Sequence, residues 1–160
     1  EERRAWHAGQ GSWRGAGDVN SRSIGIELAN PGNAPFAAPM MDRLDGLLAD
    51  ILTRWQLAPE AVIGHSDMAP GRKFDPGPRF DWHRLALGGL SIWPEPDHEA
   101  AHVDADKFAR DCQAFGWPAL DDALQLKTLR LRFRPQARGP LDATDCAIAA
   151  DLARRFSGDD

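Results

Sequence analysis

Three side chains that could take part in hydrolysis lie in one short loop, GHSDMAPGRKFDPG (Gly64 to Gly77). His65 and Asp75 are residue types that bind zinc, and Lys73 places a positive charge two residues before Asp75. A catalytic zinc ion usually has three protein ligands and leaves a fourth position for water. The loop therefore offers two ligands of such a site, together with a cation that could stabilise an oxyanion.

Each of these residues also has a simpler interpretation. Taken alone, His65 and Asp75 fit solvated residues of a surface loop about equally well, and Lys73 fits a solvent-facing side chain better. Glu27 is more informative because it lies near the end of an apolar run, SIGIEL (Ser23 to Leu28). Burying a carboxylate there is costly unless it has a partner. Beside a zinc-bound water it would act as a general base, and otherwise it would face outward from an edge strand.

The elements around this loop alternate in an α/β pattern. Apolar runs at residues 23–30 and 61–65 predict two short buried strands. Between them, apolar residues at helical spacing predict a helix over residues 40–57, with Trp55 in the core. A brief helix at residues 81–87 follows the loop.

The second half of the chain has a different pattern. Residues 92–102 carry two prolines and several charges, which is typical of a linker. Helical spacing then predicts three helices, at residues 104–115, 120–133 and 142–156. A unit of this size is too small to be an independent enzyme but suits a binding domain. Four arginines near the second helix (Arg130, Arg132, Arg134 and Arg138) predict either a solvated helix face or a surface for carboxylates of a peptide.

Composition excludes several functions. The net charge of −5 is not the electrostatic footprint of a nucleic-acid binder, and no basic recognition helix is present, so no nucleic-acid partner is expected. No apolar run approaches the roughly 18 residues of a membrane span. Cys112 and Cys146 could form a disulfide or remain buried free thiols, and the sequence leaves both open.

Three segments together resemble the type 2 N-acetylmuramoyl-L-alanine amidases, whose zinc amidase fold is shared with peptidoglycan recognition proteins. They are RAWHAG (Arg4 to Gly9), SIGIEL and GHSDMAPGRKFDPGPRFDW (Gly64 to Trp82). The 38-residue separation of Glu27 and His65 matches that family's pattern. The C-terminal segment, with LDATDCAIAADLARRF (Leu141 to Phe156), resembles the peptidoglycan-binding domain of the family's envelope enzymes.

The resemblance implies an α/β fold, with a mixed-sheet zinc amidase domain like that of peptidoglycan recognition proteins and a small three-helix all-α domain after it. We expect an amidase domain at residues 1–92, lacking its first strand, a linker at 93–102, and a peptidoglycan-binding-like domain at 103–158. The family's first zinc ligand is a His on a strand before RAWHAG, so it is expected to lie outside this chain. The chain as given is then expected to be inactive.

The resemblance also implies roles for eight residues. The zinc ligands would be His65 and Asp75, the catalytic acid/base Glu27 and the oxyanion-stabilising cation Lys73. The groove that receives the substrate would be lined or shaped by Trp6, His7, Ala8 and Asn20. His7 and His83 are weaker alternatives for a third zinc ligand, and His98 and His102 are weaker still.

The implied activity is zinc-dependent hydrolysis of the amide bond between N-acetylmuramic acid and L-alanine in peptidoglycan or muropeptides. The rival is a protein of the same fold that recognises muropeptides without cleaving them. We expect Zn²⁺ as cofactor and a monomer in the periplasm or cell envelope rather than the cytoplasm. Anchoring by an N-terminal signal outside this sequence stays open.

Overall fold

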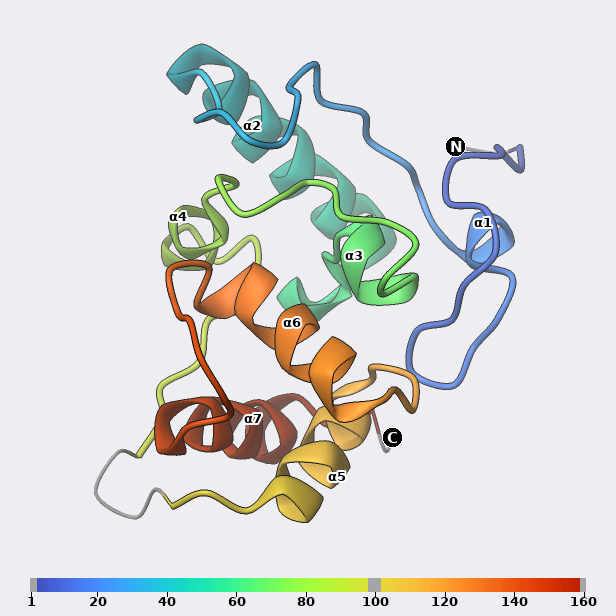
Figure 1. Ribbon diagram of the computed structural model, residues 1–160. Coiled ribbons are helices and arrows are strands. Elements are labelled where there is room, and N and C mark those ends of the chain that lie inside the picture. The colour runs from blue at the N-terminus through green and yellow to red at the C-terminus, as the bar shows by residue number, and fades with distance from the viewer. Residues whose placement is uncertain (1–2, 98–101, 159–160) are drawn as a thin grey trace.

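The structure, a computed structural model, describes residues 3–97 and 102–158, and their regular elements are helices (Figure 1). These are α1 (Val19–Arg22), α2 (Ala38–Trp55), the 3-10 helix η1 (Pro59–Ala61), α3 (His65–Met68), α4 (Trp82–Leu87), α5 (Ala105–Phe115), α6 (Asp122–Phe133) and α7 (Ala143–Phe156). None of them has the length and apolar character needed to cross a bilayer.

The two predicted strands are not confirmed. The mixed sheet that was expected for the amidase domain is therefore not confirmed either. Among the described residues the only β-type pairing is an isolated bridge between Trp13 and Ala16. The backbone is extended at Val62 and Gly64, but a strand also needs a neighbour to which it is hydrogen-bonded. An apolar run predicts burial and extension; it does not supply that neighbour. His65 therefore begins a short helix, α3, instead of ending a strand.

The predicted helix at 40–57 is confirmed as α2. Its buried stripe packs against the aromatic residues around α4 in one apolar cluster, formed by Met41, Leu44, Leu48, Phe80, Trp82 and Leu85. Trp55, the last residue of α2, is 50% exposed, so its assignment to the core is wrong. Helical spacing gives the face on which a residue lies; it does not tell how far the neighbouring elements extend along the helix.

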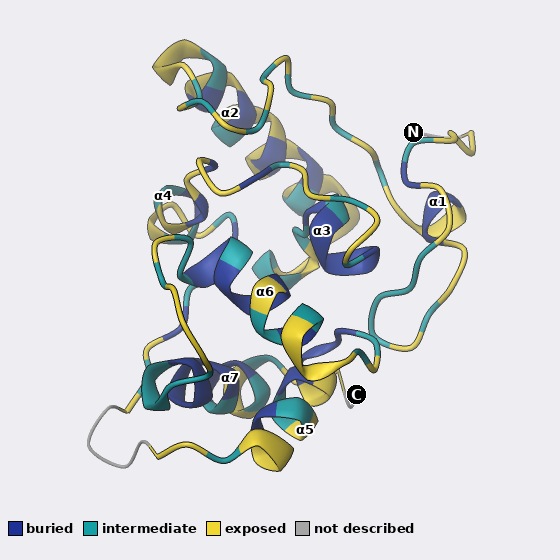
Figure 2. Cartoon of the chain, in the orientation of Figure 1, coloured by how far each residue is buried: buried dark blue, intermediate teal, exposed yellow. Residues whose placement is uncertain are grey.

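The three C-terminal helices are confirmed, each one residue or two shorter than predicted. Each begins with an aspartate whose carboxylate accepts the backbone N–H three residues on, at Asp104, Asp121 and Asp142. The helices enclose the largest apolar cluster, which includes Phe108, Cys112, Phe115, Leu129, Phe133, Ile148 and Leu152. Both cysteines are buried free thiols. Figure 2 shows much of α7 and one end of α6 coloured as buried.

Three of the four arginines predicted to form a basic surface are paired with carboxylates inside the protein. Arg130 pairs with Asp145 at 2.5 Å, and Arg134 pairs with Asp142 at 2.7 Å and Asp145 at 2.6 Å. Arg132 is also buried. Intramolecular carboxylates therefore take up the guanidinium groups of three of the four arginines, while Arg138 stays exposed and donates to the backbone carbonyls of Pro135 and Ala137.

Aromatic residues join the C-terminal helices to the rest of the chain. Trp93 packs against the cluster under α2 and against the C-terminal cluster. Trp13 packs against the C-terminal cluster and against Ala8 and Met68. The domain boundaries at 92 and 103 remain predictions, and part of the proposed linker, residues 98–101, lies outside the described residues.

Candidate active site

Backbone hydrogen bonds fold the loop after α3 back onto that helix. The N–H of Lys73 donates to the carbonyl of Ala69 at 3.0 Å. Further along, the carbonyl of Asp75 accepts the N–H of Ser66 at 3.0 Å. These bonds return the chain to the start of α3, so that Lys73 and Asp75 come close to His65, as the sequence predicted.

The return of the loop depends on a glycine. A Cβ atom at Gly64 would lie 2.7 Å from Cδ of Pro76, closer than side chains approach one another. The residue before His65 must therefore lack a side chain for the loop to pack against it.

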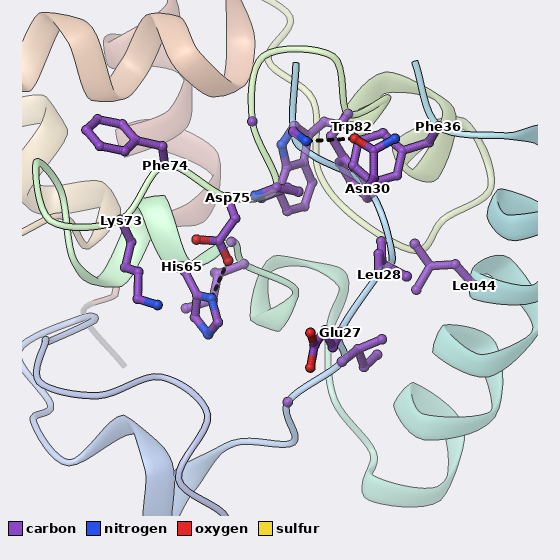
Figure 3. A pocket seen from close by; sticks show the side chains of 18 of the residues that line it. Glu27, Leu28, Asn30, Phe36, Leu44, His65, Lys73, Phe74, Asp75 and Trp82 are labelled. Atoms are coloured by element: carbon purple, nitrogen blue, oxygen red, sulfur yellow. Dashed lines mark hydrogen bonds and ion pairs between the residues drawn. The ribbon is translucent and has the colours of Figure 1, made fainter. Parts of the chain in front are cut away.

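The two predicted zinc ligands are in direct contact. Nδ1 of His65 and Oδ2 of Asp75 are hydrogen-bonded to each other (Figure 3). Their side chains are 27% and 56% exposed, so both remain open to solvent. An imidazole nitrogen beside a carboxylate oxygen fits two of the three protein ligands that a catalytic zinc ion takes. Within residues 3–97 and 102–158, no third His, Cys, Asp or Glu joins them to form a metal-binding group.

A cavity of about 1020 Å³ contains this pair, and the two predicted catalytic residues line it. Figure 3 shows the Glu27 carboxylate across the cavity from His65. The Lys73 side chain extends into the same cavity from the loop that carries Asp75. Glu27 is exposed and lies on irregular backbone. The expectation of a buried carboxylate near the end of a strand is therefore wrong. All four predicted chemical groups nevertheless face one cavity.

The four predicted groove residues divide into two pairs. Trp6, which is 80% exposed, and His7 both line the cavity. Ala8 and Asn20 are buried behind them. The Asn20 side-chain oxygen accepts the N–H groups of His7 at 3.0 Å and Ala8 at 2.9 Å. Asn20 therefore shapes the turn that presents Trp6 and His7.

Of the alternative third ligands, His7 lies nearest to the pair. Its ring stacks on that of His65 with the ring centres 6.1 Å apart. A Cβ atom at Gly25 would lie 2.4 Å from the His7 ring, so that ring packs tightly against the segment that carries Glu27. His83 instead contacts Trp93, with ring centres 4.9 Å apart and ring planes tilted by 43°. His102 lies in the segment before α5, and His98 falls outside the described residues.

Arg72 is a further residue of the cavity, and the sequence did not indicate it. Its guanidinium lines the cavity and donates to the carbonyl oxygens of Ala8, at 3.1 Å, and Gln10. Arg72 thus ties the turn beside His7 to the loop that carries Lys73. The Arg-Lys pair in the sequence marks a charged loop, but it does not tell which backbone carbonyls the arginine reaches.

Comparison with known proteins gives a consistent match. The family model described as N-acetylmuramoyl-L-alanine amidase matches residues 1–78. The chain is 35% identical to N-acetylmuramoyl-L-alanine amidase AmiD of Escherichia coli (strain K12) over 184 residues, which cover 99% of this chain and 67% of that protein. It is 40% identical to 1,6-anhydro-N-acetylmuramyl-L-alanine amidase AmpD of Enterobacter cloacae over 84 residues, covering 52% of this chain and 45% of AmpD.

The structures agree as well. The structure of E. coli AmiD in complex with the substrate anhydro-N-acetylmuramic acid-L-Ala-D-gamma-Glu-L-Lys matches with a TM-score of 0.90 at 35% identity. The match covers 99% of this chain and 72% of that one. Similarity therefore extends through the C-terminal helices as well as the segments around the cavity.

Proposed function

The chain belongs to the N-acetylmuramoyl-L-alanine amidase family, and on that premise we propose that it hydrolyses the bond between N-acetylmuramic acid and L-alanine with the help of zinc. The observation that carries this proposal is the meeting of Glu27, Lys73 and the His65–Asp75 pair at one cavity. The substrate class, peptidoglycan or muropeptides, is supported by the similarity to AmiD, whose structure contains a muropeptide.

His65 and Asp75 would hold the zinc ion as two of its protein ligands. A zinc ion in such a site supplies Lewis-acid chemistry and lowers the pKa of water to roughly 7. The chemistry of the donor set supports this assignment, because imidazole nitrogen and carboxylate oxygen are both common zinc ligands.

Glu27 would act as the acid/base. Its carboxylate accepts a proton from the attacking water, whose oxygen forms a bond to the lactyl carbonyl carbon. The carbon–nitrogen bond then breaks, and Glu27 gives the proton to the leaving amino group of L-alanine. Lys73 would stabilise the negative charge that develops on the carbonyl oxygen. The products are a carboxylate on the muramic acid and a peptide with a free amino terminus.

The test is the variant Glu27→Gln, made in the protein that the full reading frame encodes. This substitution keeps the shape of the side chain and removes its basicity. We expect kcat for release of L-alanine-bearing peptide from muropeptides to fall by about 10²–10⁴-fold. Glu60→Gln, which changes a glutamate on η1 away from the cavity lining, should cleave at the parent rate. Peptide release is followed by chromatography, and zinc per chain by elemental analysis.

Two results would oppose the proposal. Cleavage by Glu27→Gln at the parent rate would remove Glu27 from the role of base. A parent protein that binds muropeptides but neither cleaves them nor contains zinc would favour the rival, recognition without catalysis.

We further propose that the protein acts as a monomer in the cell envelope. For the location, the support is the resemblance of the C-terminal segment to the peptidoglycan-binding domain of the family's envelope enzymes, a segment that the match to AmiD covers. Cell fractionation and light scattering test the location and the oligomeric state.

A further inference from the structure

A buried ion pair joins the C-terminal helices to the segment that carries His65. Nη1 of Arg132, on α6, donates to Oδ2 of Asp67, on α3, at 2.8 Å. Each side chain is 1% exposed, and the two residues are 65 positions apart in the chain. A buried charge without a partner is costly, so each residue depends on the other to remain inside the protein.

Asp67 uses its carboxylate to fix the first turn of α3. Oδ2 also accepts the N–H of Gly64, the residue before His65, at 2.8 Å. Oδ1 accepts Nε1–H of Trp117, from the segment between α5 and α6, at 3.1 Å. Donors from three separate parts of the chain thus converge on a carboxylate two residues after His65.

Arg132 holds the residues just before α3 in the same way. Its Nη2 donates to the carbonyl of Val62 at 3.1 Å and to Oγ of Ser91 at 3.3 Å. The guanidinium also lies over the ring of Trp82, 4.2 Å from its centre. Burial lowers the pKa of Arg132, and the charge of Asp67 opposes that shift. Arg132 therefore contacts residues on both sides of His65, namely Val62 before it and Asp67 after it.

Two residues earlier on the same helix, Arg130 makes a comparable set of contacts without reaching this turn. It pairs with Asp145 at 2.5 Å and donates to the carbonyls of Gly139 at 2.7 Å and Pro140 at 2.8 Å. All these groups belong to the C-terminal helices and their connections. Arg130 is therefore a matched control for Arg132.

We propose that Asp67, Arg132 and Trp117 are positioning residues for His65. By fixing the first turn of α3 they set the direction of the imidazole, whose Nδ1 must meet Asp75. The C-terminal helices then form part of the support of the catalytic residues, in addition to any contact with the cell wall. The catalytic consequence of this inference rests on the proposed function.

The test compares Arg132→Met with Arg130→Met in the product of the full reading frame. Both variants remove a buried ion pair, so both should lower the unfolding temperature. Only Arg132→Met should accelerate amide hydrogen exchange in peptides covering residues 62–69. The same variant should lower kcat on muropeptides by about 10- to 100-fold, the usual effect of losing a group that orients a metal ligand, with little change in KM.

A milder variant protects the test against misfolding. Trp117→Phe keeps an aromatic ring in the cluster and removes only the donor to Oδ1 of Asp67, so it should change exchange and kcat in the same direction but less. The inference is overturned if Arg132→Met and Trp117→Phe show the same amide hydrogen exchange in residues 62–69, and the same kcat, as Arg130→Met. Should the parent protein not cleave muropeptides, the proposed function fails, and hydrogen exchange still decides whether the C-terminal helices hold α3.

Discussion

The segments that line the cavity and the three C-terminal helices are built in different ways. Residues 23–36 and 62–78 contain a single four-residue helix, α3, and otherwise irregular backbone. The C-terminal helices α5, α6 and α7 are capped and enclose fully buried side chains such as Leu129 and Leu152. The chemical groups of the cavity thus lie on loops or, for His65, at the start of one short helix, while apolar burial is concentrated in the long helices, as is usual when a rigid scaffold presents a functional site.

This difference implies a separation of roles. Changes inside the helical cluster should act on the free energy of unfolding, and changes of cavity side chains should act on turnover. Asp67 and Arg132 are the exception, because they belong to both regions through one ion pair. The following variants test the separation, starting with the largest expected effect.

Leu129→Ala should lower the free energy of unfolding by about 2–5 kcal/mol, because Leu129 is fully buried and its truncation leaves a cavity in the C-terminal cluster. Urea denaturation measures this change. At temperatures where the variant remains folded, kcat should stay close to that of the parent. A large loss of kcat in the folded variant would show that the helical cluster and the cavity are not separable in this way.

Lys73→Met should have the opposite profile. Loss of a group that stabilises an oxyanion typically lowers kcat by about 10²–10³-fold. Stability should change by no more than about 0.5 kcal/mol, because Lys73 is only partly buried and a methionine keeps its aliphatic part. Lys107→Met is the control, since Lys107 pairs with Asp111 on α5, away from the cavity lining. Equal turnover by Lys73→Met and Lys107→Met would remove Lys73 from the mechanism.

Asp142→Ala should destabilise the protein by about 1 kcal/mol at neutral pH, through loss of the cap of α7. Desolvation raises the pKa of Asp142, but hydrogen bonds from Arg134 and the Asp145 N–H outweigh it, and the pKa lies below its ordinary value. Asp142 therefore stabilises the fold above the ordinary pKa of aspartate, about 4, and this contribution is lost as the pH falls through the lowered pKa.

Urea denaturation of the parent and Asp142→Ala at a series of pH values checks this sign. The stability difference between them should shrink below about pH 4. A difference that stays constant down to strongly acidic pH would show that the ionised carboxylate does not stabilise α7.

The helices were predictable because their signals are local. Helical spacing of apolar residues predicted the three C-terminal helices, and the structure confirms them, with Asp104, Asp121 and Asp142 as their caps. The strands were not predictable in this way, because an extended run such as residues 23–30 becomes a strand only when another segment pairs with it. Strand formation is a property of two segments, and a pattern within one of them cannot establish it.

The candidate site was predictable to the extent that it lies in one loop. The order of His65, Lys73 and Asp75 within that loop indicated that they would meet, and Glu27 was linked to them by the family resemblance. The contacts of Arg72 and Arg132 were not predictable, because their partners lie 41–70 residues away in the chain. An arginine in a charged run looks like a surface residue until the carboxylate or carbonyl that it reaches is known.

The contact between Asp67 and Arg132 also bears on how this protein could evolve or be redesigned. Exchanging α5–α7 for an unrelated helical module would remove two of the three donors to the Asp67 carboxylate and leave only the N–H of Gly64. A chimera would therefore need a substitution at position 67 as well as a new module. Positions 67 and 132 should be inherited together, and the C-terminal helices should not behave as an interchangeable cassette.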